Sequence, residues 1–193
     1  MAAEIKASYF AGNIKALSVL GPEKEAEARR RLKTIVDASD ALSRAAWVPV
    51  AWDVELTHVL HELGGIRGVR DANKRAMLLS LEGPLMGPLA SAAVSMFGPS
   101  PRTFIRYISK AWQAGARGMG EMTVPTLGDD NAVVVHRHLP AEVRSDSVWL
   151  EGWCGVMEGL YAATRYTGSA FLSLVDDDDG GPAARYDLSW RKT

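Results

Sequence analysis

The last strand-like run of the chain alternates regularly between apolar and polar side chains, and it constrains the fold more than any other feature. Successive side chains of a strand point to opposite faces of a sheet, so a period of two predicts one buried and one solvated face. One set should face the core and the other the solvent. The first set is Ala184, Tyr186, Leu188 and Trp190, and the second is Arg185, Asp187, Ser189 and Arg191.

Two further segments show the same short period. Met122 and Val124 lie in one run, residues 132–139 form a second, and Gly128-Asp129-Asp130 between them is a turn sequence. Such an order predicts a β-hairpin. Residues 170–175 form another strand-like run before the last strand.

An amphipathic helix separates the hairpin from the last two strands. Gly152, Gly155 and Gly159 interrupt it at a cost in helix propensity, which indicates close approach to a neighbour. That neighbour is a sheet, another helix or a ligand, and we expect the helix to pack closely on the sheet. The apolar positions at helical spacing are Trp149, Trp153, Val156, Met157 and Leu160.

The first part of the chain is predicted to be helical. Pro22 is suited to a first turn, Asp53 and Ser100 to N-caps, and Gly64-Gly65 to a helix end. The expected helices cover 21–47, 53–63, 71–81, 85–97 and 101–114.

This order predicts an α+β fold with N-terminal helices packed on one face of an antiparallel sheet of about four strands, β-β-α-β-β at the C-terminal end. Because no linker-like stretch divides the chain, we expect a single domain over 1–193. Its helical part is 1–117 and its sheet-containing part 118–193.

Charge and cysteine content exclude several classes of partner. Lys and Arg number 22 against 23 Asp and Glu, so no general attraction to nucleic acid is expected. No stretch reaches the ~20 apolar residues of a spanning helix, and we expect no membrane insertion. The one cysteine, Cys154, is interpreted as small packing in a cytoplasmic protein.

Two histidine pairs are candidate metal ligands. His58 and His61 lie three residues apart on a predicted helix, and His136 and His138 share one face of a predicted strand. The alternative is an ordinary polar face in both places, which we favour, so no metal is predicted.

Two charged clusters can each be interpreted either as a binding site or as ordinary solvated surface. The run 176–179 followed by Gly180-Gly181 lacks the ligand spacing of an EF-hand and is interpreted as a solvated turn. A basic group on the predicted helices is either helix surface or a docking patch for an acidic partner. It consists of Arg67, Arg70, Lys74 and Arg75.

The element order, together with Gly12, Trp112, Glu158-Gly159 and the final Tyr186-Asp187-Leu188-Ser189-Trp190, resembles one superfamily of ligand-binding domains. It includes TRAPP vesicle-tethering subunits, bacterial 4-vinyl-reductase-type sensors and heme-NO-binding proteins. The chain is most similar to a myxobacterial family of this length. The resemblance covers nearly the whole chain.

Heme-NO-binding proteins use a proximal histidine and a Tyr-x-Ser-x-Arg motif, whereas here Tyr107-Ile108-Ser109-Lys110 is followed by Ala111. The zinc-binding relatives use several cysteines near the last strands, where this chain offers only Cys154. We therefore predict no cofactor.

What the resemblance implies is a pocket for an apolar ligand between helices and sheet, and a helical surface for a homodimer or protein partner. The predicted function is a non-enzymatic regulatory or adaptor domain. The alternatives are an enzyme with His136, His138 or His58 as acid or base, and a scaffold without ligand. The predicted pocket residues are Trp112, Trp149, Trp153, Met157 and Tyr161, and those of the dimer interface are Leu85, Leu89, Phe97 and Ile105.

Overall fold

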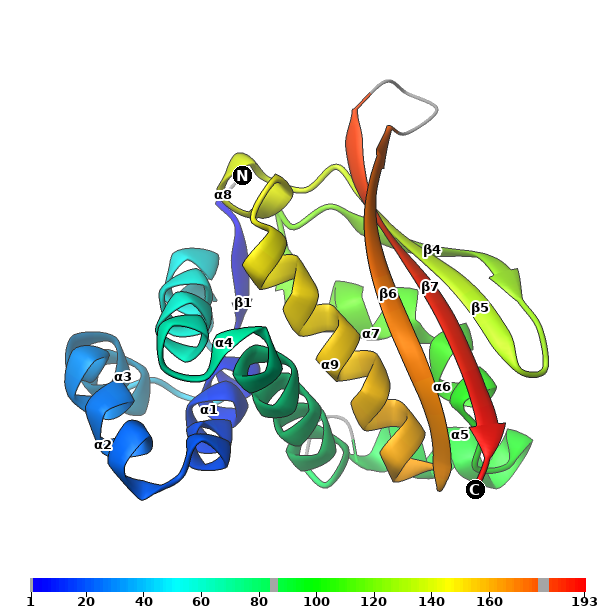
Figure 1. Cartoon of the computed structure of the whole chain (residues 1–193), viewed down its shortest axis with the longest axis horizontal. Helices are drawn as coiled ribbons and strands as arrows, with labels where there is room; N and C mark the ends of the chain where they lie inside the picture. The colour runs from blue at the N-terminus through cyan, green and yellow to red at the C-terminus, as the bar shows by residue number, and fades with distance from the viewer. Residues whose placement is uncertain (1, 84–86, 177–180) are drawn as a thin grey trace.

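The structure is a computed structural model that describes residues 2–83, 87–176 and 181–193, without the side chains of residues 89, 93 and 97. Helices gather in the N-terminal part and a twisted antiparallel sheet in the C-terminal part, with one long helix between them (Figure 1). The predicted α+β class, with helices packed on a four-stranded antiparallel sheet, is confirmed.

The four-stranded sheet has the order β4-β5-β7-β6, with antiparallel neighbours throughout. The alternation predicted for the last strand is confirmed, because its four apolar side chains are at most 4% exposed. The strands are β4 (Glu121–Leu127), β5 (Asn131–Arg137), β6 (Tyr166–Asp176) and β7 (Pro182–Lys192).

Helix α9 (Ser147–Ala163) lies between the sheet and the long helix α4 (Val50–Leu81) (Figure 1). The predicted helix end at Gly64-Gly65 is confirmed, because α4 consists of two helices that meet at a kink there, although the second helix begins before the predicted residue 71. Gly65 has φ 66° and ψ −173°, a conformation that glycine adopts without a steric penalty, and it kinks α4 there.

The prediction that α9 packs on the sheet is confirmed through its other residues, and the neighbour of its glycines is another helix, α4. A Cβ atom added at Gly155 would lie 2.2 Å from the backbone oxygen of Arg70. At Gly159 it would lie 2.8 Å from Met77 Cβ. The glycines therefore let two helix backbones approach each other, and other residues of α9 contact the sheet.

A second, three-stranded sheet near the N-terminus was not predicted. Its order is β2-β1-β3, and its strands have only two or three residues each. Runs this short show no recognisable period. The strands are β1 (Glu4–Lys6), β2 (Trp47–Pro49) and β3 (Ala116–Arg117).

Two of the remaining predicted helices are divided in the structure, and the helices α1 and α8 were not predicted. The expected helix 21–47 is broken at Leu32, and the one expected over 101–114 is broken at Tyr107. The predicted N-cap at Ser100 is confirmed, since its hydroxyl accepts the Thr103 N–H at 3.3 Å.

None of the described helices is both long and apolar enough to cross a membrane. The helices other than α4 and α9 are α1 (Ala7–Ala16), α2 (Pro22–Arg31), α3 (Lys33–Asp40), α5 (Gly87–Phe97), α6 (Pro101–Arg106), α7 (Ile108–Gly115) and α8 (Ala141–Arg144), with a 3-10 turn η1 at Leu17–Leu20.

The structure removes one residue from the predicted dimer interface. Ile105 is fully buried in the core of this chain, so it is not available to a second copy. Leu85 lies outside the described residues, and the side chains of Leu89 and Phe97 are among those not described.

Candidate functional site

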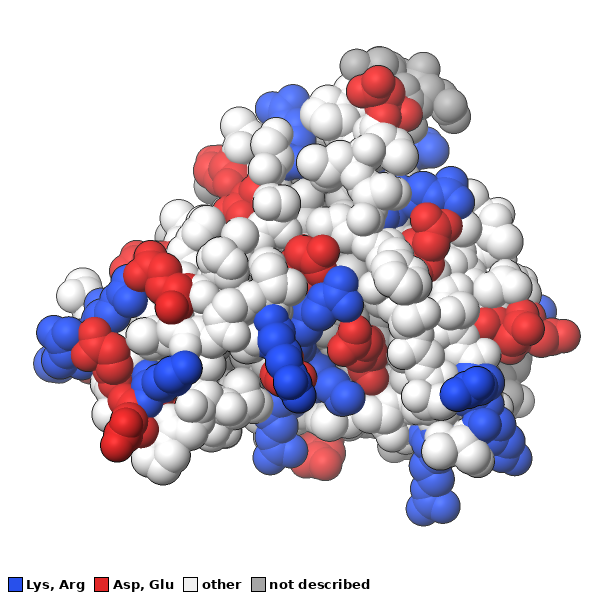
Figure 2. Space-filling view, viewed as in Figure 1, with Lys and Arg blue, Asp and Glu red and all other residues white. Residues whose placement is uncertain are grey.

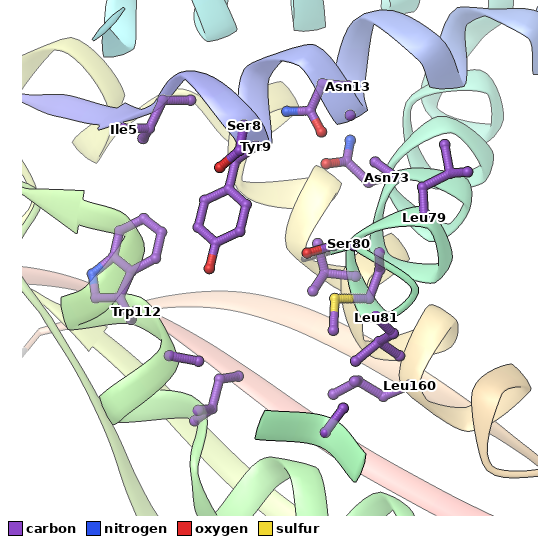
Figure 3. Close-up of a pocket in the computed structure, with 18 of the residues that line it drawn as sticks. Ile5, Ser8, Tyr9, Asn13, Asn73, Leu79, Ser80, Leu81, Trp112 and Leu160 are labelled. Atoms are coloured by element: carbon purple, nitrogen blue, oxygen red, sulfur yellow. The ribbon is translucent and has the colours of Figure 1, made fainter. Parts of the chain in front are cut away.

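A cavity of about 700 Å³ lies among helices α1, α4, α7 and α9, and we call it the tryptophan cavity (Figure 3). Three of the five predicted pocket residues line it, namely Trp112, Trp149 and Trp153. Their rings contact one another edge to face, with Trp153 at 4.9 Å from Trp112 and 6.4 Å from Trp149 between centroids. This arrangement is typical of packed aromatic side chains.

The other two predicted pocket residues lie elsewhere in α9. Met157 is fully buried in the core and does not line the cavity. Tyr161 packs beneath β6, where its hydroxyl donates to the backbone oxygen of Ser169 at 3.2 Å. Both side chains therefore face away from the tryptophan cavity, which is reached only by the Trp149 and Trp153 side of the helix.

Asp53 is the main polar feature of the cavity, and the prediction that it caps a helix is wrong. It lies inside the first turn of α4 and is 8% exposed. Its carboxylate accepts hydrogen bonds from Asn13 Nδ2 at 2.7 Å and Trp149 Nε1 at 2.8 Å. Burial raises the pKa of Asp53 above its ordinary value, and these two hydrogen bonds oppose the rise.

Tyr9 contributes a second polar group that the sequence did not indicate. Figure 3 shows its ring extending from α1 toward the middle of the cavity. One side of the ring lies against Gly115, where an added Cβ would be 1.8 Å from Tyr9 Cε2. Burial raises the pKa of the Tyr9 hydroxyl, so it remains a neutral donor and acceptor.

His136 is buried behind the cavity wall. Its Nε2 lies 3.0 Å from the backbone oxygen of Met119, and its ring meets that of Trp112 at 4.9 Å between centroids. Its Nδ1 and Trp112 Nε1 are both buried without a hydrogen-bond partner among the described residues. Burial lowers the pKa of His136 to about 4, so the imidazole is neutral at pH 7.

Neither predicted histidine pair forms a shared face. His138 lies beyond the end of β5 with φ 54°, largely exposed, and its Nδ1 is 3.9 Å from Glu121 Oε1. His58 pairs with Asp146 instead of His61, at 2.7 Å from Nε2 to Oδ2. Among the described residues, no three His, Cys, Asp or Glu side chains lie close enough to hold a metal ion.

The remaining candidates have structural surroundings. Cys154 is buried beside α4, and burial raises the pKa of its thiol to about 12, which suits packing rather than nucleophilic chemistry. Arg70 is held by Glu151 at 2.6 Å and Glu158 at 3.1 Å, and Figure 2 shows the basic side chains of this face interleaved with acidic ones. Of the predicted acidic turn, residues 177–180 lie outside the described part of the chain.

Comparison with known proteins gives structural neighbours only. No family model and no curated protein matches the sequence. The solved structure of an Fe(II) unliganded H-NOX protein from K. algicida matches with a TM-score of 0.63 at 8% identity, over 98% of each chain.

An oxygen-binding H-NOX domain related to soluble guanylate cyclases matches with a TM-score of 0.64 at 11% identity, over 97% of this chain and 96% of that one. A Cs H-NOX mutant matches with a TM-score of 0.66 at 12% identity, over 97% of both chains. The chain shares the fold of H-NOX domains. Of the predicted resemblances, the one to heme-NO-binding proteins therefore holds at the level of fold, and the TRAPP, vinyl-reductase and myxobacterial ones stay predictions.

The H-NOX fold implies a heme, and the residues of this cavity do not fit one held by histidine. All four histidines of the chain are described, and none of them lines the cavity. Tyr107 and Lys110 do line it, but Ser109 between them donates its hydroxyl to the backbone oxygen of Met122 at 2.6 Å. Heme iron in proteins is bound by His, Cys, Met or Tyr side chains, and this lining offers methionine and tyrosine but neither of the first two. The raised pKa of Tyr9 disfavours the tyrosinate that iron would need.

Proposed function

We propose that this chain is a non-enzymatic regulatory or adaptor domain that binds a small apolar molecule in the tryptophan cavity. The observation that carries the proposal is a cavity of about 700 Å³ walled by three tryptophans, with a few buried polar groups on one side. Ligand pockets in proteins typically have this size and this mixture of surfaces. The fold supports the proposal, since one structural neighbour is an oxygen-binding H-NOX domain.

The surroundings of the histidines favour a binding role over an enzymatic one. His136 faces the Met119 backbone and the Trp112 ring rather than the cavity. His58 lies on the exposed side of α4, where it pairs with Asp146. A general acid or base must come within hydrogen-bond reach of its substrate, and a ligand in the tryptophan cavity would reach neither side chain.

We expect 1-octanol to bind the purified chain and to change its tryptophan fluorescence, because Trp112, Trp149 and Trp153 line the cavity. Ala111→Phe, which adds a ring to the α7 side of the cavity, should weaken this binding about tenfold or more by occupying the space. Fluorescence titration and calorimetry measure both affinities.

The matched control is Ala162→Phe, which places the same ring on an exposed position of α9 away from the cavity. It should leave the affinity for octanol within about twofold of wild type. A wild-type chain that shows no binding of octanol up to its solubility would contradict the proposal and favour the alternative of a scaffold without ligand.

We also infer a cytoplasmic homodimer that associates through α5. Helix α5 is rich in apolar residues, and its Met96 is 72% exposed. Large exposed apolar patches are uncommon on monomers. Leu89→Glu should then yield a folded monomer in sedimentation experiments, and a wild-type chain that sediments as a monomer at micromolar concentration would remove the inference.

A further inference from the structure

Three hydrogen-bond donors on the polar wall of the tryptophan cavity are already in use. Asn13 Nδ2 donates to Asp53 Oδ1 at 2.7 Å, and Trp149 Nε1 donates to Asp53 Oδ2 at 2.8 Å. Asn73 Nδ2 donates to the backbone oxygen of Val69 at 2.9 Å. A carboxylate and a carbonyl can only accept, so these contacts fix the orientation of both amides.

Beside one remaining N–H on each amide, this wall offers a group of acceptors. The side-chain oxygens of Asn13 and Asn73 accept no hydrogen bond from the described residues, and each oxygen of the Asp53 carboxylate keeps one unused lone pair. Figure 3 shows the two amides turned toward one another on the same side of the cavity. Asp53 lines the cavity as well. Three acceptor side chains from α1 and α4 therefore lie along one part of the wall.

Asp53 also lacks a cationic partner. Its two hydrogen bonds come from a neutral amide and a neutral indole, and no Lys, Arg or His of the described residues forms an ion pair with it. A buried carboxylate is costly unless a charge of opposite sign or several donors stabilise it. The other ionisable residues that line the cavity are Lys15, Arg44 and Lys110, whose positions are exposed, and Tyr9 and Tyr107.

We infer that the molecule held in the tryptophan cavity has an apolar body and a protonated amine, which donates to the oxygens of Asp53, Asn13 and Asn73. A primary ammonium group has three N–H donors, which matches the three acceptors. Trp149 and Trp153 line the same cavity and supply apolar surface for the body of the molecule. This inference rests on the proposed function and names the ligand class of the same cavity.

The test compares three probes with the same chain length, which are n-octylamine, 1-octanol and octanoate at pH 7. Hydrogen bonds to a charged group are roughly twice as strong as those between neutral groups, so octylamine should bind about tenfold more tightly than octanol. Octanoate should bind most weakly, because its carboxylate would face three acceptors. Calorimetry of the full chain gives the three dissociation constants.

Asp53→Asn removes the charge and keeps the size of the side chain. It should weaken octylamine binding about tenfold or more and leave octanol binding within about threefold. The control is Asp37→Asn on the exposed face of α3, which pairs with Lys33 and should change neither affinity. If Asp53→Asn does not fold, Asn73→Ala removes one acceptor without changing the donors to Asp53 and should weaken the binding of octylamine more than that of octanol.

The outcomes separate this inference from the proposed function. If no probe binds, the proposed function fails. If octanol binds and octylamine binds no more tightly, the amine inference is overturned while the binding role remains. Tighter binding of octanoate also overturns it and would indicate that Lys15, Arg44 or Lys110 receives an anionic group.

Discussion

Gly155→Leu should destabilise the chain by about 3 kcal/mol or more, at the upper end of what overpacking costs. Even the first added carbon would lie 2.2 Å from the backbone oxygen of Arg70 and 2.8 Å from its Cα. Backbone atoms of α4 cannot move aside as a flexible side chain can, so α4 and α9 must separate. The free energy of unfolding, measured by urea denaturation, is the readout.

Two other glycines provide a graded comparison. Gly152→Ala should cost less, because the nearest atoms to its new Cβ belong to the movable side chain of Asn73, at 2.8 Å. Gly12→Ala in α1 meets nothing within 4 Å and should stabilise the helix by about 1 kcal/mol through propensity alone. An unchanged urea midpoint for Gly155→Leu would show that α9 does not pack on α4 through this face.

The glycine spacing shows what the sequence alone can and cannot specify. Three glycines on one helical face predicted a close neighbour, and the neighbour exists. Which element this neighbour is depends on the tertiary fold, and the local spacing of the glycines contains no information about it. By contrast, the regular alternation of β7 was sufficient to assign its buried face, because the period of a strand itself determines which residues share a face.

One part of the candidate site could be predicted from the sequence and another part could not. Large aromatic side chains at helical spacing predicted the Trp149 and Trp153 wall, but Met157 and Tyr161 lie on the same helix and face away from the cavity. The polar wall could not be predicted, because Asn13 and Asp53 are 40 residues apart and Asp53 and Trp149 are 96 apart. Asp53 was interpreted as an N-cap because aspartate is common both at the N-cap and inside the first turn of a helix.

Acidification should destabilise the wild-type chain through His136. The imidazole is fully buried, and its pKa falls from 6.5 to about 4 on folding. As the pH drops below 6.5, the unfolded chain binds a proton at this site and the folded chain does not, so stability is lost between pH 6.5 and pH 4. The loss amounts to about 3 kcal/mol by pH 4.

A variant isolates this contribution from those of other groups. Asp53 acts in the opposite direction, because its raised pKa lets the folded chain bind a proton first as the pH falls. His136→Gln keeps a donor for the Met119 oxygen and removes the titrating ring. It lowers stability at every pH by its poorer fit, so the slope of the unfolding free energy against pH is the informative quantity.

Between pH 7 and pH 4, His136→Gln should lose about 3 kcal/mol less than wild type in parallel urea titrations. The matched control is His61→Gln, which changes a half-buried position of α4 and keeps the His136 ring and its contribution. Equal losses in wild type and His136→Gln would mean that the folded chain accommodates a proton on His136. The buried Nδ1 lies beside Trp112 and has no hydrogen-bond partner in the described part of the chain, so it would then have found an acceptor through a rearrangement of the cavity wall.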